Sequence, residues 1–503
     1  MRRRPNKRSG MPASSVGRNI VRGLLAVGIA AGLAVGLRDC PRTPSTATTR
    51  IAGNSTGEVV FAAPDPAARK QRIGPHAKPA NLDKFDNIAL AFQYQTLIYP
   101  EPDSSAGYLG TVRRGVHLGV KAQVSGKGCK DGTWYQLAGG GYGCTSLGFQ
   151  VSEEPAPFWI RQIQPDRSRP VPHKYCKAVR DALRYYRPPT PKEQDEITAI
   201  LKSAKKGATP KLPEVVETQM AGDYLLALDR IEEEHGQKYY RTVRGRYVRV
   251  ADVQLKEEPE MRGVYLDAGK RLPVAFVHVQ EGTPVLKRVG KSVRTVGRAE
   301  MHARFANARF ARWGKRSVVV ATDGHAIARD LVRVARAIKR PSDIGPNQKW
   351  IHVHIPEQVL VAYEGDRPVM TTLVSSGRDF DGYVTPGGLY HIDSKLVSTT
   401  MQGNDPKEGV YEVEEVPWTL YFYNAFAVHG AYWHDIFGNK KSHGCINVAP
   451  ADARWLFYWS DPDLPPQWQS IRARDDSGTW VYITTDPVPG DADSSPSETL
   501  SAS

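Results

Sequence analysis

From Trp350 onward, apolar and polar residues alternate with a period of two. The alternating residues are Ile351, Val353 and Ile355 on one face and His352 and His354 on the other. This period is typical of a β-strand that is buried on one face only. A chain segment with this pattern must pack its apolar face against a second layer. The pattern therefore predicts a β-sheet in the C-terminal part of the chain.

Further predicted elements follow this first strand. Two apolar runs flank a turn at residues 364–366 and predict an antiparallel meander. Strands are also predicted at 418–428 and 479–485, and a short helix at 451–459 after Pro450. Strands and helices do not alternate here. We therefore expect a mainly β fold, a sandwich or barrel, rather than a doubly wound parallel sheet.

Residues 86–345 contain short apolar strands and glycine turns that recur with a common rhythm. The recurrence resembles bacterial SH3-like barrels. It predicts small SH3-like β-barrel modules before the C-terminal sandwich. Helical spacing of apolar residues interrupts the second of them. The predicted modules are residues 86–165, residues 166–270 with a helical insertion at 191–235, and a diverged third module at 271–345.

The five cysteines are too few for a disulfide-dense scaffold. Cys129 and Cys144 flank a predicted hairpin that contains Trp134, and they are the pair most compatible with a disulfide. Cys176 has no evident partner, so we expect a buried thiol.

The N-terminus has the composition of an export signal. An uncharged run, Gly23–Leu37, follows a basic stretch and is shorter than the ~20 residues that span a membrane. Residues 1–38 are therefore predicted to be a signal peptide or an N-terminal anchor. A cleaved signal, an uncleaved anchor, a lipidated Cys40 and a non-exported protein with an apolar N-terminal helix all stay open. Residues 39–85 are predicted to be a flexible linker and residues 486–503 a disordered tail.

The charge is concentrated at the same end. Of the net charge of +15, ten basic residues against one acidic residue in the first 50 positions account for +9, which leaves +6 for the remaining 453. A mildly basic body is compatible with an anionic polymer such as cell wall and gives little support for a nucleic-acid groove, so no nucleic-acid partner is expected. Export would place the body in the periplasm or cell envelope, with membrane anchoring through the N-terminus left open.

The residues with evident chemistry lie between His429 and Asn447. His429-Gly430 precede a spacer of roughly a dozen residues and then the run Ser442-His443-Gly444-Cys445-Ile446-Asn447. A thiol with a pKa near ~8.5 is mostly protonated at pH 7, so a nucleophilic cysteine needs an imidazole to accept its proton. Backbone N–H groups in a glycine-containing turn can hold the oxyanion that follows. The segment therefore predicts a cysteine acyl-transfer site.

This arrangement resembles the catalytic domain of the L,D-transpeptidase (YkuD-type) family, whose signature is HG, a spacer and then [S/T]HGC. The resemblance covers residues 349–485 and includes Gln358, the stretch 375–377 and the stretch 385–388. It implies Cys445 as the nucleophile, His429 as the base and His443 as an auxiliary histidine. It also implies roles for several neighbours. These are the carbonyl of Gly430 on His429, the N–H groups of Gly444 and Cys445 as oxyanion hole, and Ser442, Asn447, Tyr411 and Trp433 at the substrate.

The resemblance also implies the reaction. Cys445 would attack the carbonyl on the L-centre of diaminopimelate in a peptidoglycan stem tetrapeptide, release D-Ala and pass the acyl group to an amine, without metal or other cofactor. Three alternatives stay open: water as acceptor, an envelope protein as acceptor, and a catalytically silent wall-binding protein whose SH3-like modules are its main function.

Two structural interpretations compete for the same residues. Cys445 could form a disulfide with Cys176, since most cysteines of exported proteins are paired. His429, His434 and His443 could hold zinc, although their spacing is not a familiar ligand pattern. A structure shows directly whether Cys445 and Cys176 are bonded.

Overall fold

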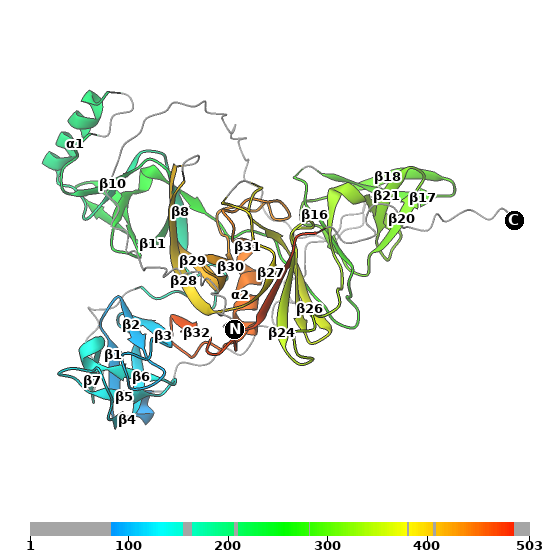
Figure 1. Ribbon diagram of the computed structural model, residues 1–503. Helices are drawn as coiled ribbons and strands as arrows, with labels where there is room; N and C mark the ends of the chain where they lie inside the picture. The colour runs from blue at the N-terminus through cyan, green and yellow to red at the C-terminus, as the bar shows by residue number, and fades with distance from the viewer. Residues whose placement is uncertain are drawn as a thin grey trace, which may run out of the picture. The chain divides into compact units, whose positions relative to one another are not determined.

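The computed structural model describes residues 82–153, 163–205, 210–280, 282–379, 382–405 and 409–486. Residues 1–38, nearly all of the linker 39–85 and the tail beyond Asp486 lie outside the described residues, so their predicted roles stay predictions. The described residues are mainly strand, with two α-helices (Figure 1). No helix among them is long and apolar enough to cross a membrane.

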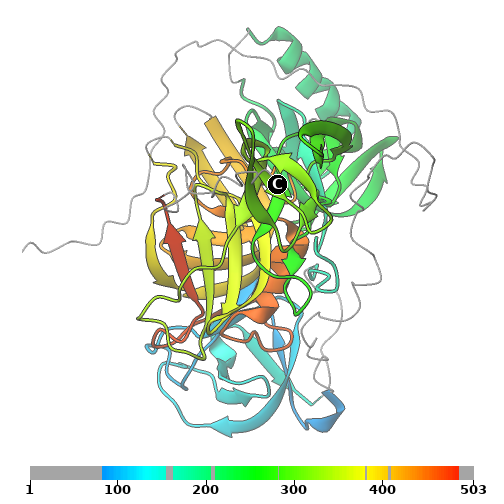
Figure 2. The same ribbon diagram turned by 90° about the vertical axis from the view of Figure 1, so that its right-hand side faces the viewer.

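The C-terminal part folds into two sheets that face each other. In the first sheet the predicted meander is confirmed: β24, β25 and β26 pair antiparallel, and the closing strand β33 pairs parallel with β24 (Figure 2). A short strand, β27, pairs with the other edge of β33. The bounds are β24 Lys349–His354, β25 Val359–Glu364, β26 Arg367–Ser375, β27 Gly388–His391 and β33 Trp480–Thr484.

The second sheet has the order β32-β28-β29-β30-β31. The prediction of one strand over 418–428 is wrong, because a turn at Asn424 and Ala425 divides it into β29 and β30. Asn424 has a φ of 47°, a left-handed conformation that asparagine tolerates better than most residues. The bounds are β28 Ser394–Asp405, β29 Gly409–Tyr423, β30 Phe426–Gly430, β31 Ile446–Val448 and β32 Ser470–Arg472.

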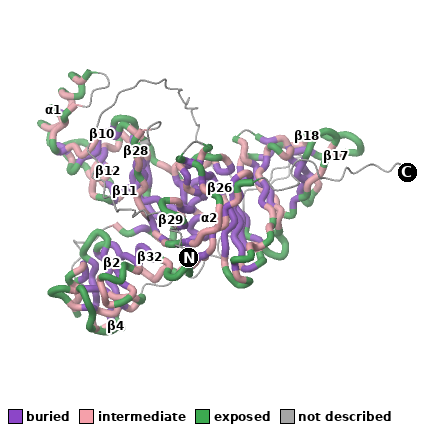
Figure 3. The backbone as a smooth tube through the Cα atoms, viewed as in Figure 1, coloured by how far each residue is buried: buried purple, intermediate pink, exposed green. Residues whose placement is uncertain are grey.

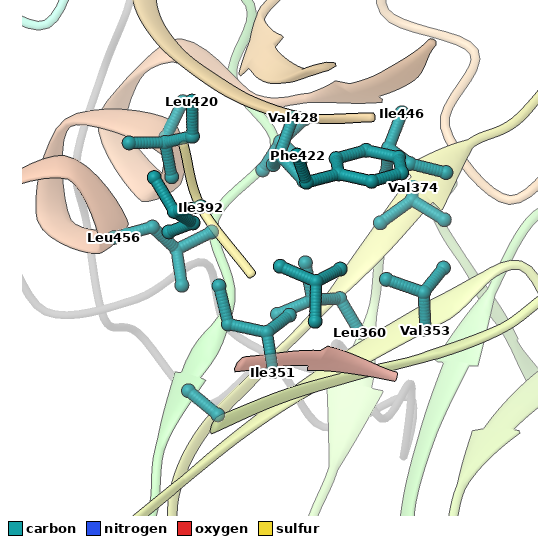
Figure 4. Packing of buried hydrophobic residues seen from close by; sticks show 14 of the residues in the cluster. Ile351, Val353, Leu360, Val374, Ile392, Leu420, Phe422, Val428, Ile446 and Leu456 are labelled. Carbon is teal, nitrogen blue, oxygen red and sulfur yellow. The ribbon is translucent and has the colours of Figure 1, made fainter. Parts of the chain in front are cut away.

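The core lies between these sheets and beneath the predicted helix, α2 (Pro450–Trp459), which is confirmed. Ile351 and Leu360 of the first sheet pack with Val428 and Ile446 of the second and with Leu456 of α2 (Figure 4). Figure 3 shows the buried residues along β26 and β29. Each such side chain contributes ~1.5–3 kcal/mol through burial. Since alternate residues of a strand point to opposite faces, the neighbours of Val428 and Ile446 project away from this core.

The described residues of the first N-terminal region form seven strands. Five of them form a sheet in the order β6-β5-β4-β1-β7, and Cys129 and Cys144 form a disulfide beside it. The bounds are β1 Ile88–Ala91, β2 Gln95–Ile98, β3 Gly110–Arg113, β4 His117–Val124, β5 Trp134–Leu137, β6 Tyr142–Cys144 and β7 Phe149–Ser152.

In the second region the predicted helical insertion at 191–235 is only half right. Residues 191–203 form α1, which begins with a capping box at Thr190 and Glu193. The apolar residues after it belong to strands instead. The bounds are β8 Lys174–Ala178, β9 Ala182–Tyr185, α1 Pro191–Ser203, β10 Val216–Met220, β11 Asp223–Glu234, β12 Gln237–Thr242, β13 Tyr247–Arg249, β14 Val253–Lys256 and β15 Val264–Tyr265.

The error at β11 has a clear physical cause. Its residues Tyr224 to Leu228 are all buried, because Leu225 packs into one apolar cluster and Leu226 into another on the opposite face. A strand that is covered on both faces shows no alternation, so a run of apolar residues with a few polar ones resembles a helical pattern. Cys176 lies in the second of these clusters as a buried thiol outside any disulfide, and burial raises its pKa to about 12.

The described residues of the third region, 271–345, contain mostly strands, and the module itself stays a prediction. The region contains a sheet in the order β19-β16-β23 and another in the order β18-β17-β22-β21-β20. The specific SH3-like arrangement of the three regions stays a prediction. The bounds are β16 Val274–Val277, β17 Thr283–Val289, β18 Ser292–Ala299, β19 Arg304–Phe305, β20 Arg309–Trp313, β21 Arg316–Val320, β22 His325–Ala328 and β23 Val332–Ala335.

Strands from the N-terminal regions extend the C-terminal sheets. β3 pairs with β32, β11 pairs with the start of β29, and β15 pairs with β26. Backbone pairing of this kind places residues of the first and second regions beside strands that carry the chemistry described below.

Candidate active site

His429 and Cys445 lie on neighbouring parallel strands. In the register of β30 and β31, Val428 pairs with Ile446 and His429 with Asn447. Val428 and Ile446 point into the core, so His429, Asn447 and the preceding Cys445 share the opposite face. Strands ~4.8 Å apart and two residues of rise separate the Cα atoms of His429 and Cys445 by about 8 Å. The fold therefore brings the predicted nucleophile and base onto one surface.

Cys445 is half-buried and is not part of a disulfide, which excludes the pairing with Cys176. Its thiol donates to the carbonyl of Ala425 at 3.6 Å. Burial raises the pKa of Cys445 to about 11, although the backbone N–H of Ala427 partly opposes this by favouring the thiolate. The thiol is therefore protonated at neutral pH, and nucleophilic attack requires a base.

His429 has the properties of that base. Its Nδ1 hydrogen-bonds to the carbonyl of Gly430 at 3.4 Å, as predicted, and a carbonyl can only accept. The proton is thus on Nδ1, and Nε2 keeps its lone pair. Burial lowers the pKa of His429 to about 4, so the ring is neutral at pH 7 and able to accept a proton.

His443 is held between two tyrosine rings. The ring of Tyr411 stacks on it with centroids 4.8 Å apart, and the ring of Tyr383 meets it edge-on at 4.8 Å. Tyr411 belongs to the part of β29 that pairs with β11. The second region therefore supports the strand whose aromatic residue positions this histidine.

The turn before Cys445 is fixed by hydroxyl groups. Ser442 Oγ donates to the carbonyl of Cys445 at 2.5 Å and accepts from the N–H of Gly444 at 3.0 Å. Thr385 Oγ1 donates to the carbonyl of Gly444 at 2.6 Å and accepts from the N–H of Gly377. The N–H of Gly444, predicted for the oxyanion hole, thus donates to Ser442 Oγ in this structure. Of the two predicted oxyanion donors, the N–H of Cys445 is the one that remains.

Gly444 is required by this turn. Its φ is +123°, and a Cβ would lie 2.5 Å from Cε1 of Phe426. We expect Gly444→Ala to lower kcat by at least about 10²-fold, because a displaced turn misplaces both the thiol and its oxyanion donor. Steady-state kinetics with the wild type and Gly409→Ala, another glycine with positive φ but open space around it, tests this. An equal loss in both variants would contradict a specific role for Gly444.

Asn447 and Trp433 also contact histidines of the site, Asn447 through His434 and Trp433 through His429. The Asn447 amide hydrogen-bonds to Nε2 of His434 at 2.9 Å, and the Trp433 ring lies 5.8 Å from that of His429. Burial lowers the pKa of His434 to about 3. Among the described residues, no group of three or more His, Cys, Asp and Glu side chains could hold a metal ion.

The loop between His429 and Cys445 is held by the third region. Arg333 Nε donates to the carbonyl of Gly438 at 3.0 Å, and His302 Nδ1 lies 3.7 Å from a carboxylate oxygen of Asp435. No pattern within the HG and SHGC motifs could have predicted these partners, because they lie more than 100 residues away in the sequence.

Tyr421 is a further residue that the sequence analysis did not identify. β29 places it opposite Ala427, on the same face as Cys445. Burial, followed by the nearby charge of Cys445, raises the pKa of Tyr421, and its side chain hydrogen-bonds to Thr399. The sequence shows that Tyr421 lies between the apolar residues Leu420 and Phe422 and so points to the opposite face of the strand. It does not show which strand pairs with this segment.

Comparisons with known proteins match the same part of the chain. Residues 348–483 match the family model described as the L,D-transpeptidase catalytic domain, YkuD. The putative L,D-transpeptidase YciB of Bacillus subtilis (strain 168) is 26% identical over 132 residues, which cover 23% of this chain and 62% of that protein. This chain thus spans less than two thirds of that relative.

Solved structures include an L,D-transpeptidase (residues 123–326) from Xylanimonas cellulosilytica, 25% identical over 29% of this chain and 65% of that one, with a TM-score of 0.19. The catalytic domain of the Enterococcus faecium L,D-transpeptidase is 22% identical over 27% of this chain and 98% of that one, with a TM-score of 0.22. By the family match, residues 348–483 of this chain are a member of the YkuD family of L,D-transpeptidase catalytic domains.

Proposed function

We propose that this chain is a peptidoglycan L,D-transpeptidase with Cys445 as nucleophile. The observation that carries the proposal is the position of His429, which shares a strand face with Cys445 and whose Nδ1–H is bound to the carbonyl of Gly430. This tautomer leaves the lone pair on Nε2, which can therefore accept the thiol proton, as an acyl transfer by cysteine requires.

In the first half-reaction, His429 Nε2 takes the proton from Cys445 Sγ. The thiolate attacks the carbonyl on the L-centre of diaminopimelate in a stem tetrapeptide, and the N–H of Cys445 donates to the oxyanion. The C–N bond to D-Ala then breaks, and His429 returns the proton to the leaving amine. A thioester between Cys445 and the stem remains.

In the second half-reaction, the amine of another stem attacks the thioester. His429 takes a proton from the amine, the new amide forms, and Cys445 leaves as thiolate and recovers a proton from His429. The two histidine steps are the reverse of each other, so one imidazole acts as base and then as acid in each half-reaction. None of these steps calls for a metal or another cofactor.

Two other acceptors use the same nucleophile. Water would make the chain an L,D-carboxypeptidase, and an amine of an envelope protein would make it an attachment enzyme. A catalytically silent wall-binding protein is the alternative of a different class, and the intact arrangement of Cys445, His429 and Gly430 counts against it. We further propose an exported protein of the cell envelope, on the basis of the apolar segment Gly23–Leu37.

Muropeptide composition separates these functions. A strain without this protein is expected to lose 3→3 cross-links if the acceptor is a second stem, tripeptide stems if it is water, and protein-linked stems if it is an envelope protein. Incubation of the purified chain with disaccharide-tetrapeptide should yield the corresponding product by mass spectrometry. An unchanged muropeptide profile together with no product in vitro would contradict the proposal.

A further inference from the structure

The sheet that carries the nucleophile continues into the first N-terminal region. β32 pairs with β28 on one side and with β3 on the other, which gives the order β3-β32-β28-β29-β30-β31. In this register Thr419 pairs with Leu396, Leu396 with Ser470, and Ser470 with Thr111. Tyr421, two residues after Thr419, and Arg113, two residues after Thr111, therefore share the face that holds Cys445.

A polar cavity of about 200 Å³ is formed by residues from three parts of the chain. Its lining includes Tyr94, Gln95 and Arg113 of the first region, Arg244 of the second region, and Thr399 and Glu415 of the C-terminal domain. The lining is therefore complete only when all three parts of the chain are present.

The two arginines that line the cavity differ in how fully their charge is balanced by carboxylates of the chain. Arg113 and Glu415 form a buried ion pair, to which Ser398 and His173 add further contacts. Although burial opposes it, Arg113 and His173 hold the pKa of Glu415 well below its usual range. This pair therefore has a positive and a negative charge that cancel.

Arg244 is different. Its side chain is 41% exposed, and one of its terminal nitrogens contacts Glu412 at 3.1 Å. A guanidinium has five N–H donors, so several donors are left for a ligand. Together with the hydroxyl groups of Tyr94 and Thr399 and the amide of Gln95, it makes a lining rich in hydrogen-bond donors, which suits a carboxylate.

The cavity is connected to the nucleophile by side chains. Thr399 lines the cavity and hydrogen-bonds to Tyr421, whose pKa responds to the charge of Cys445. β29 is two strands away from β31, which places Tyr421 about 10 Å from Cys445 at the usual strand spacing. An extended peptide of four residues spans about 14 Å. A stem with its scissile carbonyl at Cys445 is thus long enough to pass Tyr421 and reach Thr399 at the cavity.

We propose that this cavity binds a carboxylate of the peptide stem that reacts at Cys445, with Arg244 as the contacting cation. The inference rests on the proposed function and gives the N-terminal regions a role in selecting the substrate. Because Arg244 binds a part of the substrate that does not change in the reaction, its loss should raise KM more than it lowers kcat.

Equilibrium binding to the full chain carrying Cys445→Ala tests the cavity without turnover. The probes are the stem tetrapeptide and analogues in which single carboxyl groups are amidated. Arg244→Gln is expected to raise the Kd of the tetrapeptide about tenfold, as expected for the loss of one charge-assisted hydrogen bond. One amidated analogue should bind more weakly to the parent chain and show no further loss with Arg244→Gln.

Arg246→Gln is the matched control. Arg246 lies two residues away, pairs with Glu217 and does not line the cavity. It should change the Kd less than twofold, and Arg244→Lys should restore part of the affinity. Thermal unfolding of each variant reports on folding.

Equal effects of Arg244→Gln and Arg246→Gln, or no analogue that removes the effect of Arg244→Gln, would overturn the cavity as a carboxylate site. A different result would be that tetrapeptide binding depends on Arg244 while the chain with Cys445 intact shows no transfer. This result would overturn the proposed reaction but would still support the cavity as a carboxylate site. The two failures are therefore distinguishable.

Discussion

Replacing Cys445 with alanine is expected to lower kcat for stem-peptide transfer by about 10⁴-fold or more while the chain stays folded. The thioester cannot form without Sγ, and the remaining donors stabilise only a much slower direct attack. The substitution removes one partly exposed atom whose contact is a 3.6 Å hydrogen bond to Ala425, so the free energy of unfolding should change by less than about 1 kcal/mol.

Cys176→Ala is the matched control, because Cys176 is the other cysteine outside a disulfide among the described residues. It packs in the apolar cluster around Leu226 rather than on the face that carries Cys445 and His429, and its loss should leave the activity unchanged. A carbapenem is expected to add its mass to the Cys445 peptide in the wild type and in Cys176→Ala, but not in Cys445→Ala. A fully active Cys445→Ala variant would rule out the mechanism.

Replacing His429 with glutamine is the second large effect, with an expected loss of about 10²–10⁴-fold in kcat/KM at pH 7. The pKa values give this loss a distinct pH dependence. In the wild type, His429 is neutral above its pKa of about 4 and can accept the proton, so activity falls only as the pH drops through about 4. The thiol itself ionises near its pKa of about 11.

The variant lacks the base, so its residual rate should follow the thiolate and rise about tenfold per pH unit from neutral pH toward about 11. The measurements are pH–rate profiles of transfer and of alkylation by iodoacetamide. His391→Gln is the control, since His391 lies on β27 with Nδ1 bound to the carbonyl of Gly478. A His429→Gln profile parallel to that of the wild type would show that another group is the base.

The sequence predicted the strands of the C-terminal meander but not how far they are buried. The alternation of Ile351 with His352 predicted one buried face, whereas β24, β25 and β26 are buried on both faces. The meander of β24 to β26, the strand β33 and the helix α2 all have a clear hydrophobic period or a proline at the helix start. The prediction failed at β11, which is buried on both faces, and at the turn with Asn424, where two apolar strands follow each other with only two residues between them. Local periodicity carries no information about a second covering layer.

The residues of the site also fall into those that the sequence predicted and those that it did not. Cys445, His429 and Gly430 were predicted from a short motif, because a thiol, an imidazole and a tight turn are themselves the chemistry. The positions of Tyr421, Arg333 and Arg244 were not, since each acts through a strand pairing or a contact between regions distant in the sequence.

The sequence by itself determined which groups can react: a cysteine, a histidine with a carbonyl beside it, and a glycine that permits the turn. The tertiary structure decided which face they share, how far burial moves their pKa values and which distant residues contact the loop and strands around them. The physical reason is that reactivity belongs to a functional group, whereas desolvation and strand register depend on every residue that packs against it.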